Sequence, residues 1–231
     1  MISFAYKMKP IDRRRLLKQV GIAALVSSVP GSARAYATTF KMPASPADAL
    51  AILTQGNERF RAKRLSSLQE DLEILRTNTL EQQKPFAAIL SCADSRVPVE
   101  LMFDQTIGHL FVVRVAGNLA TPATIASLEY GAAVLGVKVL IVIGHRNCGA
   151  VQATMAAKAV PGQISSLYQY IRPALKAGGT DLDEAIRENA KYQVALMRAS
   201  SPLLASLVKE GKLSLHAAYY DLKSGAVEIL A

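Results

Sequence analysis

Two short segments of the 231-residue sequence contain residue types that hold a divalent metal ion. Cys92 lies in the first segment, and His145 and Cys148 lie three residues apart in the second. Thiolate and neutral imidazole suit zinc, a borderline-soft ion. A His-x-x-Cys pair alone is a weak signal. Three protein donors, however, leave one tetrahedral position free, which distinguishes a catalytic zinc site from a closed structural one.

An acidic and a basic residue follow Cys92 closely, at Asp94 and Arg96. A carboxylate beside a zinc-bound water can orient the proton of that water, and a guanidinium can hold the carboxylate bidentately and keep it ionised. Away from the cysteines, this pair would indicate an ordinary loop salt bridge. Beside a predicted metal ligand it indicates catalysis, and Asp94 is also a possible fourth ligand in a closed state of the site.

Two other interpretations of these residues stay open. Cys92 and Cys148 are the only cysteines, and an oxidising compartment would permit a disulfide between them. The acid, base and histidine around the cysteines favour the metal site instead. The chain could also be a non-catalytic binding module stabilised by zinc. Asp94 and Arg96 argue against this, because a structural site has no need for them.

The elements around these segments indicate an α/β fold. Apolar runs at 86–91, 110–115 and 137–143 predict buried strands, and 213–221 and 226–230 predict a terminal hairpin. Helices are predicted at 46–62, capped by Ser45, and at 68–77, 124–135, 149–160, 164–175, 182–199 and 202–210.

Strands that alternate with helices predict a mainly parallel central sheet with an antiparallel edge strand, helices on both faces and an amino-terminal helical arm. In such sheets, ligands bind beyond the carboxyl ends of the strands. The first chemical segment follows the strand predicted at 86–91, and the second follows the strand predicted at 137–143. We therefore expect both segments at the same edge of the sheet.

The amino terminus has the composition of an export signal. Residues 1–35 carry seven cations and one anion, which is +6 of the formal charge of +9. A basic start, an apolar run at 20–29 and the small-x-small sequence Ala33-Arg34-Ala35 predict cleavage after Ala35. The run is about half of the ~20 residues needed to span a bilayer, so no stable membrane anchor is expected. A disordered basic tail is the alternative.

The basic start also predicts the export route and the cellular compartment of the protein. The sequence at 13–18, Arg-Arg-Arg-Leu-Leu-Lys, resembles a twin-arginine signal, which predicts a periplasmic protein. Without residues 1–35 the remaining charge gives no support for a nucleic-acid partner. We expect a cleavable signal at 1–35, an extended arm at 36–45 and a single catalytic domain at 46–231.

Three motifs, in this order, resemble the signatures of beta-class carbonic anhydrases. They are Cys92-x-Asp94-Ser95-Arg96, then Arg-Val-Ala-Gly-Asn at 114–118, then Gly144-His145-x-x-Cys148-Gly149. The resemblance extends from about Ala47 to the end of the chain. It implies one zinc ion per subunit on Cys92, His145 and Cys148, with Asp94 and Arg96 as a catalytic dyad. The implied reaction is reversible hydration of carbon dioxide to bicarbonate and a proton by a zinc-bound hydroxide.

The resemblance also implies a substrate pocket, an assembly and a resting state. Gln83 matches a substrate-orienting amide of plant-type members, and Phe111 and Tyr130 match pocket walls that a neighbouring subunit can supply. Simple core packing is the alternative for Phe111 and Tyr130. Family members are homodimers or larger, and the helix face around Leu50 and Leu53 would suit a partner. Ile89 stands where bicarbonate-regulated members carry tryptophan, which predicts an open site. Similar sequences hydrolyse carbonyl sulfide or carbon disulfide, which is the alternative activity.

Overall fold

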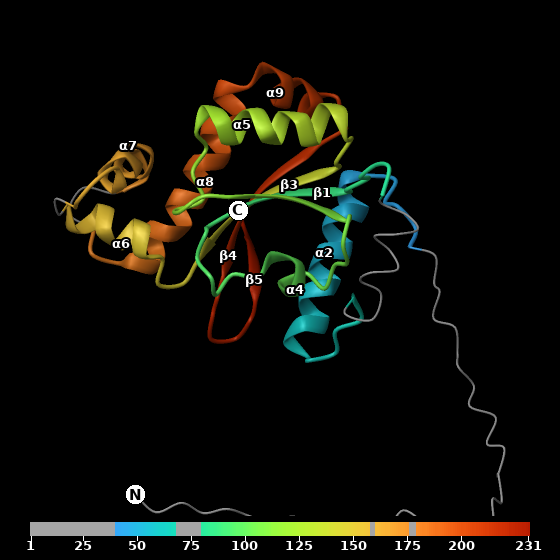
Figure 1. Ribbon diagram of the computed structural model, residues 1–231, viewed down its shortest axis with the longest axis horizontal. Coiled ribbons are helices and arrows are strands. Elements are labelled where there is room, and N and C mark those ends of the chain that lie inside the picture. Colours follow the sequence, from blue (N-terminus) through green and yellow to red (C-terminus); the bar gives the residue numbers. More distant parts are fainter. Residues whose placement is uncertain (1–39, 68–79, 158–159, 176–178) are drawn as a thin grey trace, which may run out of the picture. The chain divides into compact units, whose positions relative to one another are not determined.

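The computed structural model describes residues 40–67, 80–157, 160–175 and 179–231. A five-stranded sheet with the strand order β2-β1-β3-β4-β5 lies at the centre of residues 41–231 (Figure 1). Four strands are parallel: β1 (Ala87–Ser91), β2 (Leu110–Arg114), β3 (Val139–His145) and β4 (Ser214–Tyr220). The edge strand β5 (Val227–Leu230) is antiparallel to β4. The predicted strands, the terminal hairpin and the α/β class are confirmed.

Helices cover both faces of the sheet (Figure 1). Side chains at 87 and 89 of β1, and at 139, 141 and 143 of β3, pack with α2 (Pro46–Arg61) and α4 (Val99–Met102). Side chains at 88, 90, 140 and 142 pack with α5 (Pro122–Glu129), α8 (Leu182–Ser200) and α9 (Pro202–Lys209). Every residue of β1 and β3 is buried. Burial of both faces explains why these strands are continuous apolar runs rather than alternating ones.

Ser45 caps helix α2, as predicted, and forms a capping box with Asp48. The Ser45 hydroxyl accepts a hydrogen bond from the N–H of Asp48, and the Asp48 carboxylate accepts one from the N–H of Ser45. The apolar face of the helix packs on the protein's own sheet: Leu53 is fully buried in the core, and Leu50 packs against that core. The expectation that Leu53 faces a partner is therefore wrong, because the chain's own sheet covers it, whereas Leu50 is only partly buried.

Several helix boundaries differ from prediction. The segment predicted as a helix at 124–135 is α5 followed by a π-helical turn, Tyr130–Val134. Helix α6 (Gly149–Ala156) ends before 160, because Ala157 is left-handed with φ of 49°. The segment 164–175 comprises two 3₁₀ turns, Ile164–Leu167 and Arg172–Ala174, around the short helix α7 (Tyr168–Ile171). The short helix α4 was not predicted, and the predicted helix at 68–77 lies outside the described residues.

The connections of the sheet create a crevice at one edge. The chain leaves β1 toward β2 on one side and leaves β3 toward β4 on the other, although β1 and β3 are neighbours. Loops that diverge from adjacent parallel strands open a crevice beyond their carboxyl ends. Ser91, the last residue of β1, pairs in register with Ile143, which lies two residues before the end of β3. The loops after β1 and β3 therefore begin close together at the same edge of the sheet.

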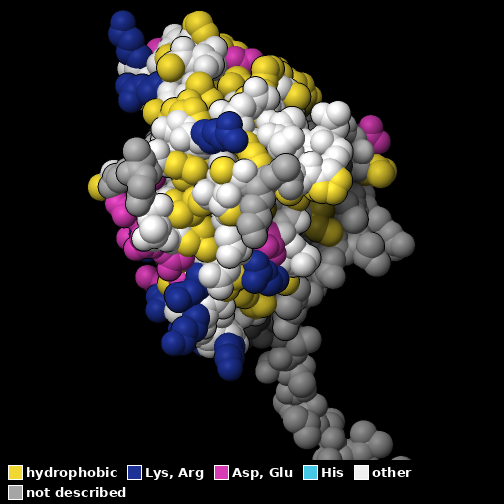
Figure 2. Space-filling model, turned by 90° about the vertical axis from the view of Figure 1, so that its left-hand side faces the viewer, with side chains coloured by type: hydrophobic (Ala, Val, Ile, Leu, Met, Phe, Trp, Pro, Cys, Tyr) yellow, Lys and Arg dark blue, Asp and Glu magenta, His cyan; other side chains and the backbone are white. Residues whose placement is uncertain are grey.

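The surface of the described part has no single charged face in the view of Figure 2. Lys and Arg side chains lie there in separate groups, mixed with acidic side chains and apolar areas. No helix among the described residues is long and apolar enough to span a bilayer. The predicted export signal at 1–35 lies outside the described residues, as does the predicted arm up to residue 39. Residues 40–45 precede α2 without forming a helix or strand.

Candidate metal centre

The three predicted metal ligands come together in the crevice between β1 and β3. Cys92 directly follows β1, His145 is the last residue of β3, and Cys148 is the N-cap of α6. Their ligand atoms all lie within 4.8 Å of one another, and all three residues are buried. Residues 53 positions apart in the sequence meet here because the carboxyl ends of two parallel neighbours share one edge of the sheet.

The donor atoms fit a zinc ion. Both cysteines are free, so the alternative of a disulfide is not what the structure contains. Nδ1 of His145 donates a hydrogen bond to the carbonyl oxygen of Arg146 at 3.0 Å, which fixes the neutral tautomer and leaves Nε2 with a lone pair. Nε2 is buried and has no hydrogen-bond partner among the residues that the structure describes. A buried imidazole nitrogen with a free lone pair, next to two sulfur atoms, is the arrangement that a zinc ligand set requires.

The two sulfur atoms differ in their electrostatic surroundings. A hydrogen bond from Cys148 lowers the pKa of Cys92 to about 4, against burial, and a hydrogen bond from the N–H of Gly117 at 3.3 Å contributes in the same direction. The same Cys148–Cys92 contact, together with burial, raises the pKa of Cys148. The N–H groups at the start of α6 lower the pKa of Cys148, but the contact with Cys92 and burial outweigh them, so Cys92 carries the thiolate in preference to Cys148.

Asp94 and Arg96 form an ion pair beside the donor atoms. Nε of Arg96 donates to Oδ1 of Asp94 at 3.0 Å, and Nη2 donates to Oδ2 at 2.7 Å. These hydrogen bonds lower the pKa of Asp94, which keeps the carboxylate ionised. Oδ2 lies 3.8 Å from Nε2 of His145. The pair is therefore more than an isolated loop salt bridge, because its acidic member lies next to a predicted metal ligand.

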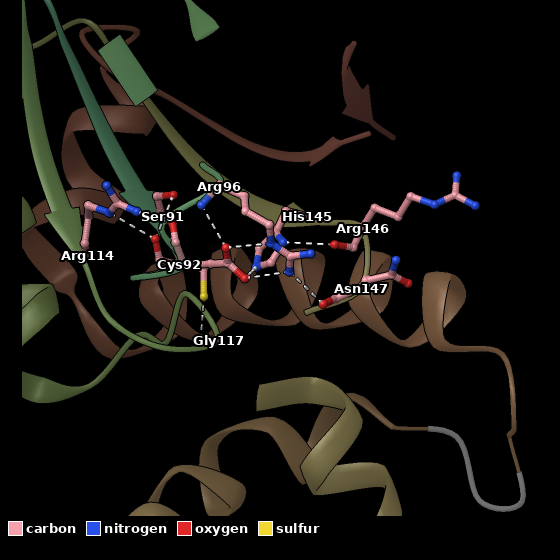
Figure 3. A network of polar contacts seen from close by, with 9 residues as sticks. Ser91, Cys92, Arg96, Arg114, Gly117, His145, Arg146 and Asn147 are labelled. Atoms are coloured by element: carbon pink, nitrogen blue, oxygen red, sulfur yellow. Dashed lines mark hydrogen bonds and ion pairs between the residues drawn. The ribbon is translucent and has the colours of Figure 1, made fainter. Parts of the chain in front are cut away.

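A second arginine holds the loop from its other side (Figure 3). Nε of Arg114, at the end of β2, donates to the carbonyl oxygen of Cys92 at 3.0 Å, and Nη2 donates to the carbonyl oxygen of Asp94 at 2.6 Å. Nη2 of Arg96 donates to the carbonyl oxygen of Asn147 at 3.2 Å, which connects the two metal-binding loops. The loop geometry is thus fixed by two guanidinium groups from different elements.

The predicted pocket residues form a separate cluster. Gln83 precedes β1, Phe111 is the second residue of β2, and Tyr130 begins the π-helical turn. The ring centroids of Phe111 and Tyr130 are 6.3 Å apart. Gln83 and Tyr130 line one surface hollow of about 690 Å³. These residues lie toward the amino-terminal ends of β1 and β2, whereas the metal ligands lie at the carboxyl ends. Within one copy of the chain, the structure does not bring the two groups together.

Sequence reasoning did not assign roles to Gly117 and Arg114, although both lie in the Arg-Val-Ala-Gly-Asn motif at 114–118. Gly117 has a φ of +81° and donates its N–H to the sulfur of Cys92. A glycine a few residues after a strand is a signal for an unusual backbone conformation. The partner of its N–H, however, depends on a residue 25 positions earlier and could not be inferred from spacing.

Known proteins of one family are similar to this chain. The family described as "Carbonic anhydrase" matches residues 87–227. Carbonic anhydrase 2 of Mycobacterium tuberculosis is 35% identical over 189 residues, which cover 78% of this chain and 91% of that protein. The carbonic anhydrase of Mycolicibacterium smegmatis is 34% identical over 197 residues, which cover 81% and 95%. The solved structure of a Coccomyxa beta-carbonic anhydrase is 27% identical in sequence with a TM-score of 0.60, covering 81% of this chain and 87% of that one.

Proposed function

Because the chain belongs to the beta-class carbonic anhydrase family, we propose that it catalyses the reversible hydration of carbon dioxide to bicarbonate and a proton. The proposal depends on one observation above all. Three buried donors, from Cys92, His145 and Cys148, converge beside a carboxylate that Arg96 holds ionised. This arrangement offers both a metal site and a group that can orient a water molecule.

Zinc is the cofactor of this family, and the donor set fits it. Cys92, His145 and Cys148 would hold the ion. A bound zinc ion supplies Lewis acidity, which lowers the pKa of a water molecule from near 16 to about 7 and so provides a nucleophile at neutral pH.

The protein's own residues supply orientation and charge. Asp94 accepts hydrogen bonds only, because Arg96 keeps it ionised, so it can hold the proton of an attacking water species and direct the lone pair toward the carbon of carbon dioxide. Arg114 fixes the carbonyl groups on both sides of this carboxylate and keeps the loop in place. A purely structural zinc site would gain nothing from an oriented carboxylate, so these contacts favour an enzyme over a binding module.

The direct test is a stopped-flow assay of the zinc-loaded protein with a pH indicator and dissolved carbon dioxide, together with elemental analysis. Cys148→Ala should lose both zinc and hydration activity. Val151→Ala is a matched control, because Val151 is a fully buried residue of the same helix that offers no ligand atom. Undiminished hydration by Cys148→Ala, or absence of zinc in the wild-type protein, would refute the proposal. Turnover of carbonyl sulfide or carbon disulfide in excess of carbon dioxide would assign the chain to the alternative activity.

We also propose that copies of the chain associate and complete each other's sites. Gln83, Phe111 and Tyr130 lie away from the metal ligands of their own copy, so they can contribute to a substrate pocket only in a neighbour. The hollow beside them is lined by polar and apolar side chains, and three of the apolar ones, Met42, Tyr130 and Val134, are 45%, 47% and 66% exposed. Val134→Glu should shift the mass measured by analytical ultracentrifugation toward the monomer and lower activity without loss of zinc.

Finally, we propose that residues 1–35 direct export to the periplasm by the twin-arginine route. The support is the sequence itself: the consecutive arginines at 13–15, the apolar run at 20–29 and the small-x-small site ending at Ala35. Replacement of Arg13, Arg14 and Arg15 by lysine should retain the protein in the cytoplasm. Mass spectrometry of the exported wild-type protein should find a new amino terminus at Tyr36.

A further inference from the structure

The hydrogen bond to the Cys92 sulfur comes from a backbone segment that belongs to no helix or strand. Residues 115–120 follow β2 as a turn in which Gly117 has a φ of +81° and Asn118 a φ of +50°. Regular secondary structure cannot satisfy the polar groups of such a segment, so other parts of the protein must hold it in place. The position of the Gly117 N–H therefore depends on what holds its peptide.

Two side-chain amides of α8 bind this segment. Nδ2 of Asn189 donates to the carbonyl oxygen of Gly117 at 3.0 Å, and Oε1 of Gln193 accepts from the N–H of Ala120 at 2.8 Å. Both amide side chains are completely buried. They lie one helical turn apart on the face of α8 that packs against the core, where polar residues are kept only when fully hydrogen-bonded.

Gln193 also determines which way the Asn189 amide points. Its Nε2 donates to Oδ1 of Asn189 at 2.9 Å and to the carbonyl oxygen of Tyr170 at 2.8 Å. An asparagine amide has one accepting end and one donating end. Since Oδ1 of Asn189 accepts the hydrogen bond from Gln193, Nδ2 of Asn189 must face Gly117. The sequence of contacts is continuous from Tyr170 through both amides and the Gly117 peptide to the sulfur of Cys92.

We propose that Asn189 is a positioning residue for the metal ligand Cys92. It holds the Gly117 peptide so that the N–H of Gly117 points at the sulfur. An N–H donor draws electron density from a thiolate and fixes the direction of its lone pairs, and contacts of this kind around metal ligands tune metal affinity. The inference rests on the proposed zinc function, but it concerns a residue that touches neither metal nor substrate.

The test compares Asn189→Ala with a matched control, Asn57→Ala, in the full chain. Asn57 is also a buried asparagine that binds backbone: Nδ2 donates to the carbonyl oxygens of Met102 and Gly225, and Oδ1 accepts from the N–H of Val227. Both variants lose a buried amide and should be less stable. Only Asn189→Ala loses the support of the Gly117 peptide.

The readouts are Zn²⁺ affinity, measured by competition with a chelator, and the thiolate-to-cobalt absorption band of the Co²⁺-substituted protein. In Asn189→Ala we expect Zn²⁺ to bind about tenfold more weakly. The cobalt band should move to longer wavelength, because a sulfur without its N–H donor gives up electrons more easily. Asn57→Ala should retain the wild-type affinity and band. A wild-type band and affinity in Asn189→Ala, or the same changes in Asn57→Ala, would overturn the inference.

A second variant serves if Asn189→Ala does not fold. Gln193→Glu retains the shape of the side chain and an acceptor for Ala120, but places an oxygen against Oδ1 of Asn189. We expect the same shift of the cobalt band, smaller in size, and an unshifted band would count against the inference. Failure of the wild-type protein to bind Zn²⁺ or Co²⁺ would instead refute the proposed function, so the two failures are distinguishable.

Discussion

Both carboxylate oxygens of Asp94 accept hydrogen bonds from the Arg96 guanidinium, at 3.0 Å from Nε and 2.7 Å from Nη2. For Asp94 to become a metal ligand, at least one of these charge-assisted bonds would have to be broken or shared. Ile89, three residues before Cys92, is buried in the core of β1 and offers no polar group that would favour such a change. We therefore retain the prediction of an open site, with no inhibition by added bicarbonate beyond product inhibition.

Asp94→Asn should separate metal binding from catalysis. The three ligands stay in place, so zinc content should be unchanged. The amide can no longer act as an ionised acceptor, and its NH₂ group repels the Arg96 donors, so kcat/KM for carbon dioxide should fall about a hundredfold or more. Stopped-flow hydration and elemental analysis provide both measurements. Glu228→Gln is the control, because Glu228 is the acidic partner of Arg187 in another surface pair. Equal activity in Asp94→Asn and Glu228→Gln would remove Asp94 from the mechanism.

Arg114→Lys should weaken metal binding although it preserves the positive charge. The guanidinium spans two carbonyl oxygens, of Cys92 and Asp94, which a single ammonium group cannot reproduce. We expect about a tenfold loss of zinc affinity in a chelator competition, in the range typical of groups that orient metal ligands. Arg187→Lys, at a surface arginine paired with Glu228, is the matched control. Unchanged affinity in Arg114→Lys would show that charge alone, rather than the fork geometry, is what the loop needs.

Asp104 should make stability depend on acid pH. Burial alone would raise the pKa of this carboxyl, but hydrogen bonds from Arg59, Ser66 and Ser67 outweigh it and hold the pKa at about 2, below the ordinary 3.8. A lowered folded-state pKa stabilises the protein fully above pH 4, and this stabilisation is lost as the pH falls from about 4 to about 2. It amounts to about 2 kcal/mol.

Urea unfolding of the wild-type protein and of Asp104→Asn at several pH values measures this contribution. The gap between their free energies of unfolding should be constant from pH 7 to pH 5 and shrink between pH 4 and pH 2.5. Asp48→Asn is a suitable control, since Asp48 is an exposed carboxylate whose hydrogen bonds within the described residues go to its own helix cap. A gap that does not change across this range would mean that Asp104 acts through its shape and not through its charge.

Removal of zinc should destabilise the protein and expose its thiols to reaction. The ion would bind three donors that exist together only in the folded chain, so its binding adds to the free energy of unfolding. Without it, the thiolate of Cys92 is a nucleophile at neutral pH. We expect a lower unfolding midpoint and faster alkylation after chelation, both reversed by added Zn²⁺. Equal alkylation rates with and without Zn²⁺ would contradict the assignment of Cys92 as a ligand.

The parts of the fold that were predictable are those that local pattern determines. The strands β1 and β3 are buried on both faces, so they are unbroken apolar runs, and the cap of α2 depends on Ser45 and Asp48 alone. Once these two strands were placed in a parallel sheet, the meeting of Cys92 with His145 followed from the geometry of the sheet edge. The segment 164–175 was wrongly predicted as one helix, although Pro173, which lacks an N–H and lies in the 3₁₀ turn that ends the segment, is visible in the sequence.

The contacts that hold the site depended on tertiary structure. Asn189 and Gln193 are polar residues on the buried face of α8, at positions where the apolar pattern would place aliphatic side chains. That departure was visible in the sequence, but its partners, Gly117 and Ala120, were not. The arrangement of Gln83, Phe111 and Tyr130 around a separate hollow likewise required the structure, because motif order says nothing about which copy of the chain a side chain serves.

The fixed pairing of Ser91 with Ile143 gives metal content a diagnostic use. A slip of β1 by one residue against β3 would turn Cys92 to the other face of the sheet and move it about 3.3 Å along the strand, which would leave the ion without its third donor. Retention of zinc after refolding therefore reports that the two central strands have paired correctly. A colorimetric zinc determination could then grade preparations of this protein before any kinetic work begins.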